Sequence, residues 1–155
     1  MTESLWDWSL RVYIGDVPDI LIDLQDAHGQ NVPLLLWAAW CASRGASFGE
    51  TRQVAIQWAI TWETVIVPLR TVRRQLKGMG RDVLRSKVKA AELAAEKVLL
   101  ELLSCLKTVE APRPDWPANV RAAAMLTTLL SVSTAWSPGC PCEKLVRLTQ
   151  ALSET

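Results

Sequence analysis

The feature that most constrains the fold is an apolar stripe with helical spacing in the second half of the chain. Seven side chains follow one another four and three positions apart: Leu84, Val88, Ala91, Ala95, Val98, Leu102 and Cys105. This spacing predicts one long amphipathic helix over about residues 81–108, with the stripe as its buried a/d seam. Further leucines follow residue 98, so we expect the second half of this helix to be buried more fully.

Helix start and stop signals recur along the rest of the chain. Ser4 and Asn31 are typical N-caps, and Gly29 is a typical helix stop. Together with the apolar spacing between them, such signals predict helices over about residues 4–14, 16–29, 32–44, 117–133 and 143–152.

A further long helical segment is predicted between Ser47 and Gly78. Ser47-Phe48-Gly49-Glu50 has the spacing of a capping box, which typically begins a helix. Pro68 lies inside the segment, and proline removes one helical hydrogen bond, so we expect a kink or a break near Val67.

The fold class follows from these elements. No stretch alternates apolar and polar residues as a half-buried strand would, and 155 residues are the length of one domain. We therefore predict an all-α, single-domain multi-helix bundle of about six or seven helices spanning residues 1–155. The helices within 117–152 are expected to complete the bundle.

The chain is expected to be soluble and cytoplasmic. The longest apolar run, Val32 to Ala42, is shorter than the roughly twenty residues that cross a bilayer. The first ten residues carry acids where a secretory signal would carry basic residues. In a cytoplasmic protein the four cysteines are expected to be reduced thiols.

Charge is distributed unevenly along the sequence. Residues 1–30 have a net charge of −5, whereas residues 70–89 have a net charge of +7. The basic segment could dock an acidic partner, and the residues predicted to bind it are Arg70, Arg73, Arg74, Lys77 and Arg81. Alternatively, these cations gather near a helix C-terminus and pair with the acidic N-terminal helices. No aromatic residue interrupts the basic run, which argues against a groove that stacks single-stranded nucleic acid.

Tryptophan and acidic residues suggest a second kind of site. Trp37 and Trp40 share one helix face, as do Trp58 and Trp62, so all four could line an apolar pocket, although core packing is the simpler interpretation. Asp23 and Asp26 are three residues apart and could hold a divalent cation.

A polar cluster, Gln25, Asp26 and His28, is the best candidate for a polar site, although we expect it to tie this corner to a neighbouring helix. Glu92 and Glu96 form a second carboxylate pair. His28 is the single histidine, and no Glu-x-x-His sequence occurs, so we expect neither a metal site nor a cofactor. Cys140-Pro141-Cys142 is at most half of a zinc site, and an ordinary loop is the simpler interpretation.

Three motifs occur in a fixed order over roughly residues 5–100. The first is Trp6, Ser9, Leu10 and Tyr13; the second is Leu24, Gln25, Asp26, Gly29, Val32, Leu34, Leu35 and Leu36, with Trp40 after it; the third, after Trp62, is Pro68, Leu69, Arg70, Arg73, Arg74, Leu76 and Lys77. The pattern resembles an uncharacterised proteobacterial family of small helical proteins that is classified as a domain of unknown function. The resemblance implies a helical fold over a family-like part of about 5–108, and it implies no known activity.

The sequence favours a non-catalytic binding protein, an adaptor or assembly factor that docks an acidic protein through residues 70–89. The alternative is an enzyme or carrier for an apolar or isoprenoid-diphosphate-like small molecule, which would use Asp23, Asp26 and a tryptophan-lined pocket. A weaker alternative is RNA binding through residues 70–89.

Overall fold

The computed structural model describes residues 3–110, 115–139 and 141–155, and this part of the chain is mostly helical. The helices are α1 (Leu5–Val12), α2 (Val17–His28), α3 (Val32–Ser43), α4 (Thr51–Leu76), α5 (Asp82–Ser104), α6 (Ala118–Trp136) and α7 (Cys142–Ser153). Two short strands, β1 (Ala46–Ser47) and β2 (Val109–Glu110), pair in antiparallel fashion. The predicted all-α bundle is confirmed. No helix in the described residues is long and apolar enough to span a membrane.

Helix α3 forms the centre of the core. Every side chain from Pro33 to Cys41 is buried, because α1, α2, α4, α5 and α6 all contact this helix. The indole of Trp37 is fully buried and stacks on the ring of Phe48, with 4.6 Å between the ring centroids. Helix α7 covers α2 and α6 and adds Leu145 and Leu148 to the same core.

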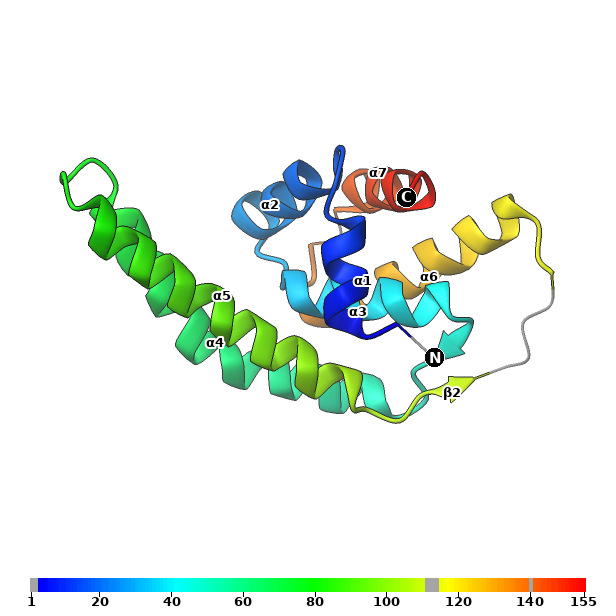
Figure 1. Ribbon diagram of the computed structural model, residues 1–155. Coiled ribbons are helices and arrows are strands. Elements are labelled where there is room, and N and C mark those ends of the chain that lie inside the picture. The colour runs from blue at the N-terminus through cyan, green and yellow to red at the C-terminus, as the bar shows by residue number, and fades with distance from the viewer. Residues whose placement is uncertain (1–2, 111–114, 140) are drawn as a thin grey trace.

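Helices α4 and α5 form a long antiparallel hairpin that extends well beyond the rest of the molecule (Figure 1). Near its base the hairpin packs on α1, α3 and α6, whereas its distal end and the turn around residues 77–81 project away from these helices. The molecule therefore consists of a bundle around α3 and a projecting arm.

Most of the predicted helix ends are confirmed by local contacts. The Ser4 hydroxyl accepts a hydrogen bond from the Asp7 amide, and the Asn31 side chain accepts one from the Leu34 amide. Gly29 ends α2 in a left-handed conformation, φ 62°, which glycine adopts without steric cost. The predicted capping box at Ser47 is wrong, because Ser47 belongs to β1 and α4 begins at Thr51 without a side-chain cap.

Of the kink or break predicted near Val67, the break is absent. Helix α4 continues from Thr51 to Leu76 with Pro68 inside it. Pro68 and Thr64 are both exposed, so water can reach the Thr64 carbonyl that loses its partner at this proline. A proline on the solvent side of a helix held by tertiary contacts therefore does not end it.

The long helix predicted over residues 81–108 is confirmed as α5, but the predicted seam is wrong. Leu84, Ala91, Val98, Leu102 and Cys105 are exposed. The side chains that are buried or half-buried lie mostly one position later: Arg85, Val88, Glu92, Ala95, Leu99, Leu103 and Leu106. The helix is rotated because Leu99 and Leu103 reach the main core, while Glu92 at the same face meets arginines of α4.

Candidate functional site

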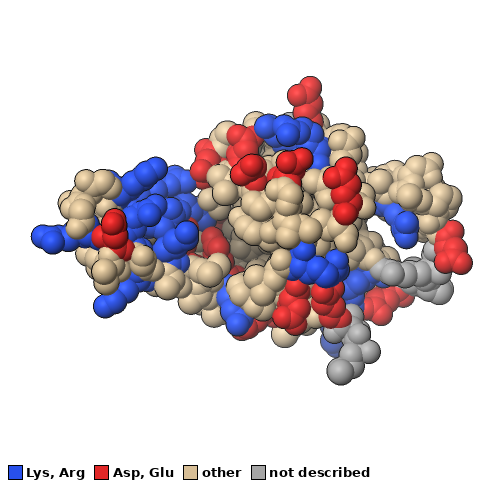
Figure 2. Space-filling model, turned by 45° about the horizontal axis from the view of Figure 1, so that its top comes forward, with Lys and Arg blue, Asp and Glu red and all other residues tan. Residues whose placement is uncertain are grey.

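Basic side chains gather at the distal end of the hairpin (Figure 2). We call this surface the basic tip and define it by four exposed cations: Lys77, Arg81, Lys87 and Lys89. Within the described residues none of the four makes a salt bridge. Their charge is therefore available to a partner.

Apolar side chains lie among these cations. Met79, Val83 and Leu84 are exposed by 63%, 74% and 51%. Isolated exposed apolar residues are common, but three of them close together in the sequence at the end of a projecting arm favour a contact surface. The basic tip can thus offer both charge and apolar area.

Arg70 and Arg73 have a different environment from the basic tip. The Arg70 guanidinium lies 3.1 Å from a Glu92 carboxylate oxygen and 3.3 Å from Glu96, and Arg73 lies 2.5 Å from Glu92. The Glu92 side chain is only 8% exposed. This ionic cluster joins α4 to α5 at the point where the hairpin leaves the core. Two of the five predicted partner-binding residues are thus engaged in this cluster, and a third, Arg74, pairs with Asp26.

The cluster changes the ionisation of its members. Burial raises the pKa of Glu96 against the opposing charge of Arg70, and the hydrogen bond from Arg73 to Glu92 raises the pKa of Arg73. A carboxyl group with a raised pKa favours the folded state below its unfolded pKa, and this contribution is lost as the pH rises through the folded pKa. Considered by itself, the raised pKa of Glu96 therefore makes the fold more stable in mild acid than at neutral pH.

The predicted polar site joins helices instead of lining a cavity. Asp26 is 2.5 Å from Arg74, and Asp23 is 3.0 Å from Lys144 of α7 and 3.8 Å from the His28 imidazole. The Gln25 side-chain amide donates to the Asp26 carboxylate. This corner of α2 is thus connected to α4 on one side and to α7 on the other.

Asp26 titrates differently from Glu96. Burial acts to raise the pKa of Asp26, but hydrogen bonds from Gln25 and Arg74 outweigh it and lower the pKa below its usual value. The ion pair therefore contributes stability above the unfolded pKa and is lost as the pH falls through the lowered one. Since both side chains are about half exposed, that contribution is small.

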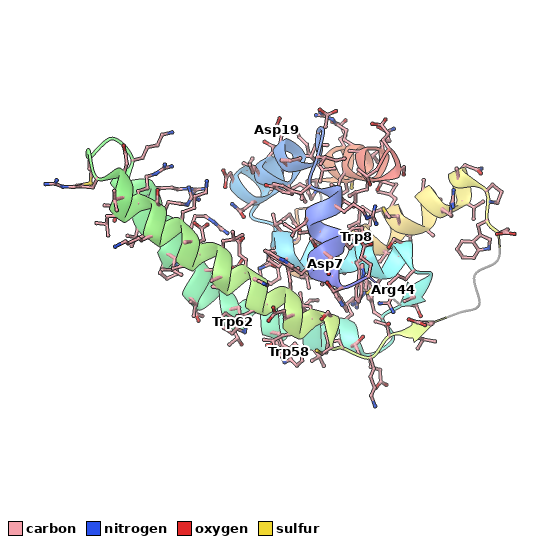
Figure 3. The ribbon with its side chains drawn as sticks, in the orientation of Figure 1. Asp7, Trp8, Asp19, Arg44, Trp58 and Trp62 are labelled. Atoms are coloured by element: carbon pink, nitrogen blue, oxygen red, sulfur yellow. The ribbon has the colours of Figure 1, made fainter. Side chains whose placement is uncertain are left out.

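The four tryptophans proposed as a pocket do not meet at one cavity. Trp37 and Trp40 are buried in α3, and the Arg44 guanidinium covers the Trp40 ring at 4.1 Å. Trp58 and Trp62 are half-buried and lie along the edge of the hairpin that faces away from α1 (Figure 3). A cavity at the start of α6 is lined by none of these four tryptophans, and a second one near Ser4 is lined by Trp40 alone among them.

Among the residues that the structure describes, the cysteines show no arrangement suited to a metal. Within the described residues no group of three or more His, Cys, Asp or Glu side chains could hold an ion. Cys140 of the Cys140-Pro141-Cys142 sequence lies outside the described residues. Cys41, Cys105 and Cys142 are free thiols, of which Cys41 is buried.

Cys41 is expected to resist alkylation in the folded protein. Burial raises the pKa of its thiol to about 12. At pH 8 its thiolate fraction is then about a thousandfold smaller than that of an ordinary thiol, and solvent access is blocked as well. Mass spectrometry after brief iodoacetamide treatment should find Cys105 and Cys142 modified and Cys41 intact, with Cys41 reacting once urea unfolds the chain. Equal labelling of Cys41 and Cys105 under native conditions would contradict this.

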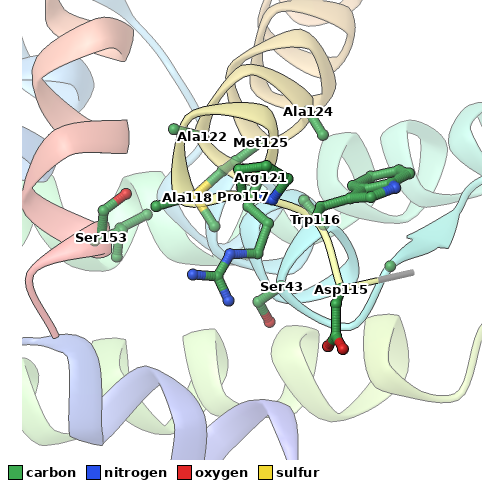
Figure 4. Close-up of a pocket in the computed structure, with 13 residues that line it drawn as sticks. Ser43, Asp115, Trp116, Pro117, Ala118, Arg121, Ala122, Ala124, Met125 and Ser153 are labelled. Atoms are coloured by element: carbon green, nitrogen blue, oxygen red, sulfur yellow. The ribbon is translucent and has the colours of Figure 1, made fainter. Parts of the chain in front are cut away.

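A cleft of about 570 Å³ lies between the start of α6 and the ends of α3 and α7 (Figure 4). Trp116, Met125 and Leu152 provide apolar walls, and Asp115 and Arg121 are its charged residues. The sequence prediction missed this cleft. Its one signal was the Pro-rich connection at 110–119, which is long enough to cross an end of the bundle.

Comparison with protein families gives one match. Residues 4–103 match the family described as "Protein of unknown function (DUF2390)", which is well over half of the chain. The chain belongs to this family. The DUF2390 region contains α1 to α4 and nearly all of α5, so the hairpin, the basic tip and the ionic cluster all lie inside it, whereas α6 and α7 follow it. Comparisons with curated proteins and with solved structures give no match.

Proposed function

We propose that this DUF2390 protein is a non-catalytic binding protein, an adaptor or assembly factor, that docks an acidic protein through the basic tip of its hairpin. The observation that carries the proposal is the free charge of the tip: Lys77, Arg81, Lys87 and Lys89 are exposed and unpaired within the described residues.

The shape of the hairpin supports this proposal. The side chains of an arm that projects from the bundle bury little surface against the core, so the distal third of the arm gains little stability from it. Clustered positive charge on such an arm speeds encounter with an acidic surface, and Met79, Val83 and Leu84 supply apolar area once contact is made.

The predicted partner-binding residues divide into two groups within this proposal. Lys77 and Arg81 contact the partner directly. Arg70 and Arg73 act as positioning residues, because they hold α4 against α5 through Glu92, and Arg74 holds the hairpin against α2 through Asp26.

A protein partner is favoured over the other two candidates. RNA binding would use the same charges, but no aromatic side chain accompanies them for stacking on bases. The enzyme or carrier alternative gains no support from geometry, because Asp23 and Asp26 pair with Lys144 and Arg74. We also propose a cytoplasmic location in a proteobacterium, which the free thiols and the motif pattern support.

A triple charge reversal tests the proposal. The variant Arg81→Glu, Lys87→Glu, Lys89→Glu alters only exposed residues of α5 and the turn, so folding should be unaffected. It is expected to weaken capture of the partner from a native-host lysate by at least about tenfold, because electrostatic steering and rim contacts are both reversed. Quantitative mass spectrometry of tagged protein, with nuclease-treated lysate in parallel, measures this.

The matched control is Lys107→Glu, Arg121→Glu, Arg147→Glu. These cations are also exposed, lie off the hairpin, and change the net charge by the same amount. Capture should be retained in the control. If both triple variants lost capture of the partner equally, the interaction would depend on net charge alone. If nuclease treatment removed all binding, the ligand of the basic tip would be RNA.

A further inference from the structure

The solvent-facing surface of α4 carries no charge over five turns. From Gln53 to Val72 the exposed side chains are Gln53, Val54, Gln57, Ile60, Thr61, Thr64, Val65, Val67, Pro68, Thr71 and Val72. The charged residues in this interval, Glu63 and Arg70, are turned inward: Glu63 meets Asn31, and Arg70 meets Glu92, which also pairs with Arg73 just after the interval. Depletion of charge is typical of the centre of protein–protein interfaces, not of free helix surfaces.

The polar groups of this surface are largely used within the helix. The hydroxyls of Thr61 and Thr71 each donate to a carbonyl four residues earlier at 3.0 Å, and the hydroxyl of Thr64 donates to the carbonyl of Thr61 at 2.6 Å. The threonines therefore present mainly their methyl groups outward. The surface is more apolar than its composition suggests, and the polar groups that covering it would desolvate are the Gln53 and Gln57 side-chain amides and the Thr64 carbonyl freed by Pro68.

The apolar residues follow the spacing of a helix-pairing seam. Val54, Trp58, Thr61, Val65, Pro68 and Val72 are four, three, four, three and four positions apart. The inward-facing positions form a separate stripe that includes Ala55, Ala59, Ile66 and Leu69, so α4 has two seams. The inner one packs within the core, and the other, which we call the outer seam, has no partner within the described residues except at Trp58, which also packs against the core.

We infer that the outer seam pairs with the outer seam of a second copy of this chain, with the two α4 helices antiparallel. This inference is independent of the partner proposed for the basic tip, because it involves other residues. The spacing of the outer seam reads the same in both directions, so an antiparallel two-fold arrangement opposes Val54 with Val72, Trp58 with Pro68 and Thr61 with Val65. A surface without charges needs no complementary charge and is therefore suited to contact with itself.

Electrostatics selects the antiparallel direction. Parallel pairing would bring together two segments that each carry a net charge of +7 over residues 70–89. Antiparallel pairing keeps the two tips apart by about the length of α4, roughly 39 Å for its 26 residues, which is several Debye lengths at physiological salt. Each tip then stays free at an opposite end of the pair.

The surface area of the chain is consistent with a missing contact. The accessible surface is 9005 Å², whereas a compact chain of 17.2 kDa exposes about 7,800 Å². The excess is larger than the roughly 800 Å² that each partner contributes to a standard-size interface. Pairing of the outer seams would bring the surface per chain back toward the value for compact proteins.

The oligomeric state of the full chain tests the inference. Sedimentation equilibrium of the wild type at micromolar concentration should give twice the 17.2 kDa mass of one chain. Val65→Lys places two like charges near the two-fold axis and is expected to raise the dissociation constant by at least about a hundredfold. Val146→Lys on α7 is the matched control, since this valine is similarly exposed, 38% against 45%, and lies off the hairpin. It should leave the dimer intact.

Two outcomes would overturn the inference. One is a wild type that stays monomeric; if Val65→Lys then also removes a different protein in host pull-downs, the outer seam belongs to that partner. The other is a dimer that Val65→Lys leaves unchanged while circular dichroism shows both proteins folded. The tip triple reversal should leave the mass of the dimer unchanged, which separates failure here from failure of the docking proposal.

Discussion

Trp37→Ala is expected to lower the free energy of unfolding by about 3–5 kcal/mol, the range for truncating a large buried aromatic side chain. The Trp37 indole is fully buried in the central helix and stacks on Phe48, so truncation leaves a cavity and removes an aromatic contact. Because α3 touches five other helices, relaxation around the cavity would disturb several contacts at once. Urea denaturation followed by far-ultraviolet circular dichroism measures the change.

Trp116→Ala is the control for this prediction. Trp116 lies beside the cleft and is 44% exposed, so the same truncation should cost less than about 1 kcal/mol. A loss for Trp37→Ala as small as that for Trp116→Ala would contradict the placement of α3 at the centre of the core.

Glu92→Ala is expected to destabilise the protein by about 3–5 kcal/mol, the cost of removing one member of a buried ion pair. The carboxylate of Glu92 accepts hydrogen bonds from both Arg70 and Arg73, which are themselves largely buried. Without it, two guanidinium groups would lie close together with only Glu96 to compensate them. Amide hydrogen exchange should show the largest loss of protection in the distal parts of α4 and α5.

Two further variants make this result interpretable. Glu101→Ala removes an exposed carboxylate from the same helix and should change stability by less than about 0.5 kcal/mol. The triple variant Arg70→Leu, Arg73→Leu, Glu92→Leu should regain most of the loss, since well-packed apolar residues can replace a buried ionic cluster. If Glu92→Ala proved as mild as Glu101→Ala, the ionic cluster would not hold the hairpin together.

The two proposals give the hairpin a single purpose. The ionic cluster keeps α4 and α5 together where the core ends, the outer seam joins two hairpins, and the basic tips lie at opposite ends of the pair. A dimer of this kind would present two identical docking surfaces, so a partner with two acidic sites would bind with higher avidity than either site alone provides.

Helix ends were predictable where the signal is local. Ser4, Asn31 and Gly29 act through hydrogen bonds or backbone angles within a few residues, and each does what its type predicts. The Ser47 capping box failed because Ser47 pairs instead with Val109, which is distant in sequence. A local capping pattern is therefore overridden when a long-range contact gives the same backbone groups another hydrogen-bond partner.

The candidate site was predictable only in part. The charge of residues 70–89 was evident from the sequence, but spacing alone cannot distinguish Arg73, which is half-buried on Glu92, from Lys77 and Arg81, which are free. Likewise, Asp26 and Arg74 are 48 residues apart, and only the tertiary structure brings them together.

The sequence by itself determined that this protein is helical, where most helices end, and that one long amphipathic helix follows a basic segment. It could not determine which face of that helix is buried. The predicted seam and the observed one differ by a rotation of about one residue, and the two helix faces differ little in apolar content along α5. The tertiary structure decided the outcome, because burying Leu99 and Leu103 against the core and satisfying Glu92 with two arginines stabilises one rotation over the other. That choice left Leu84 and Val98 exposed.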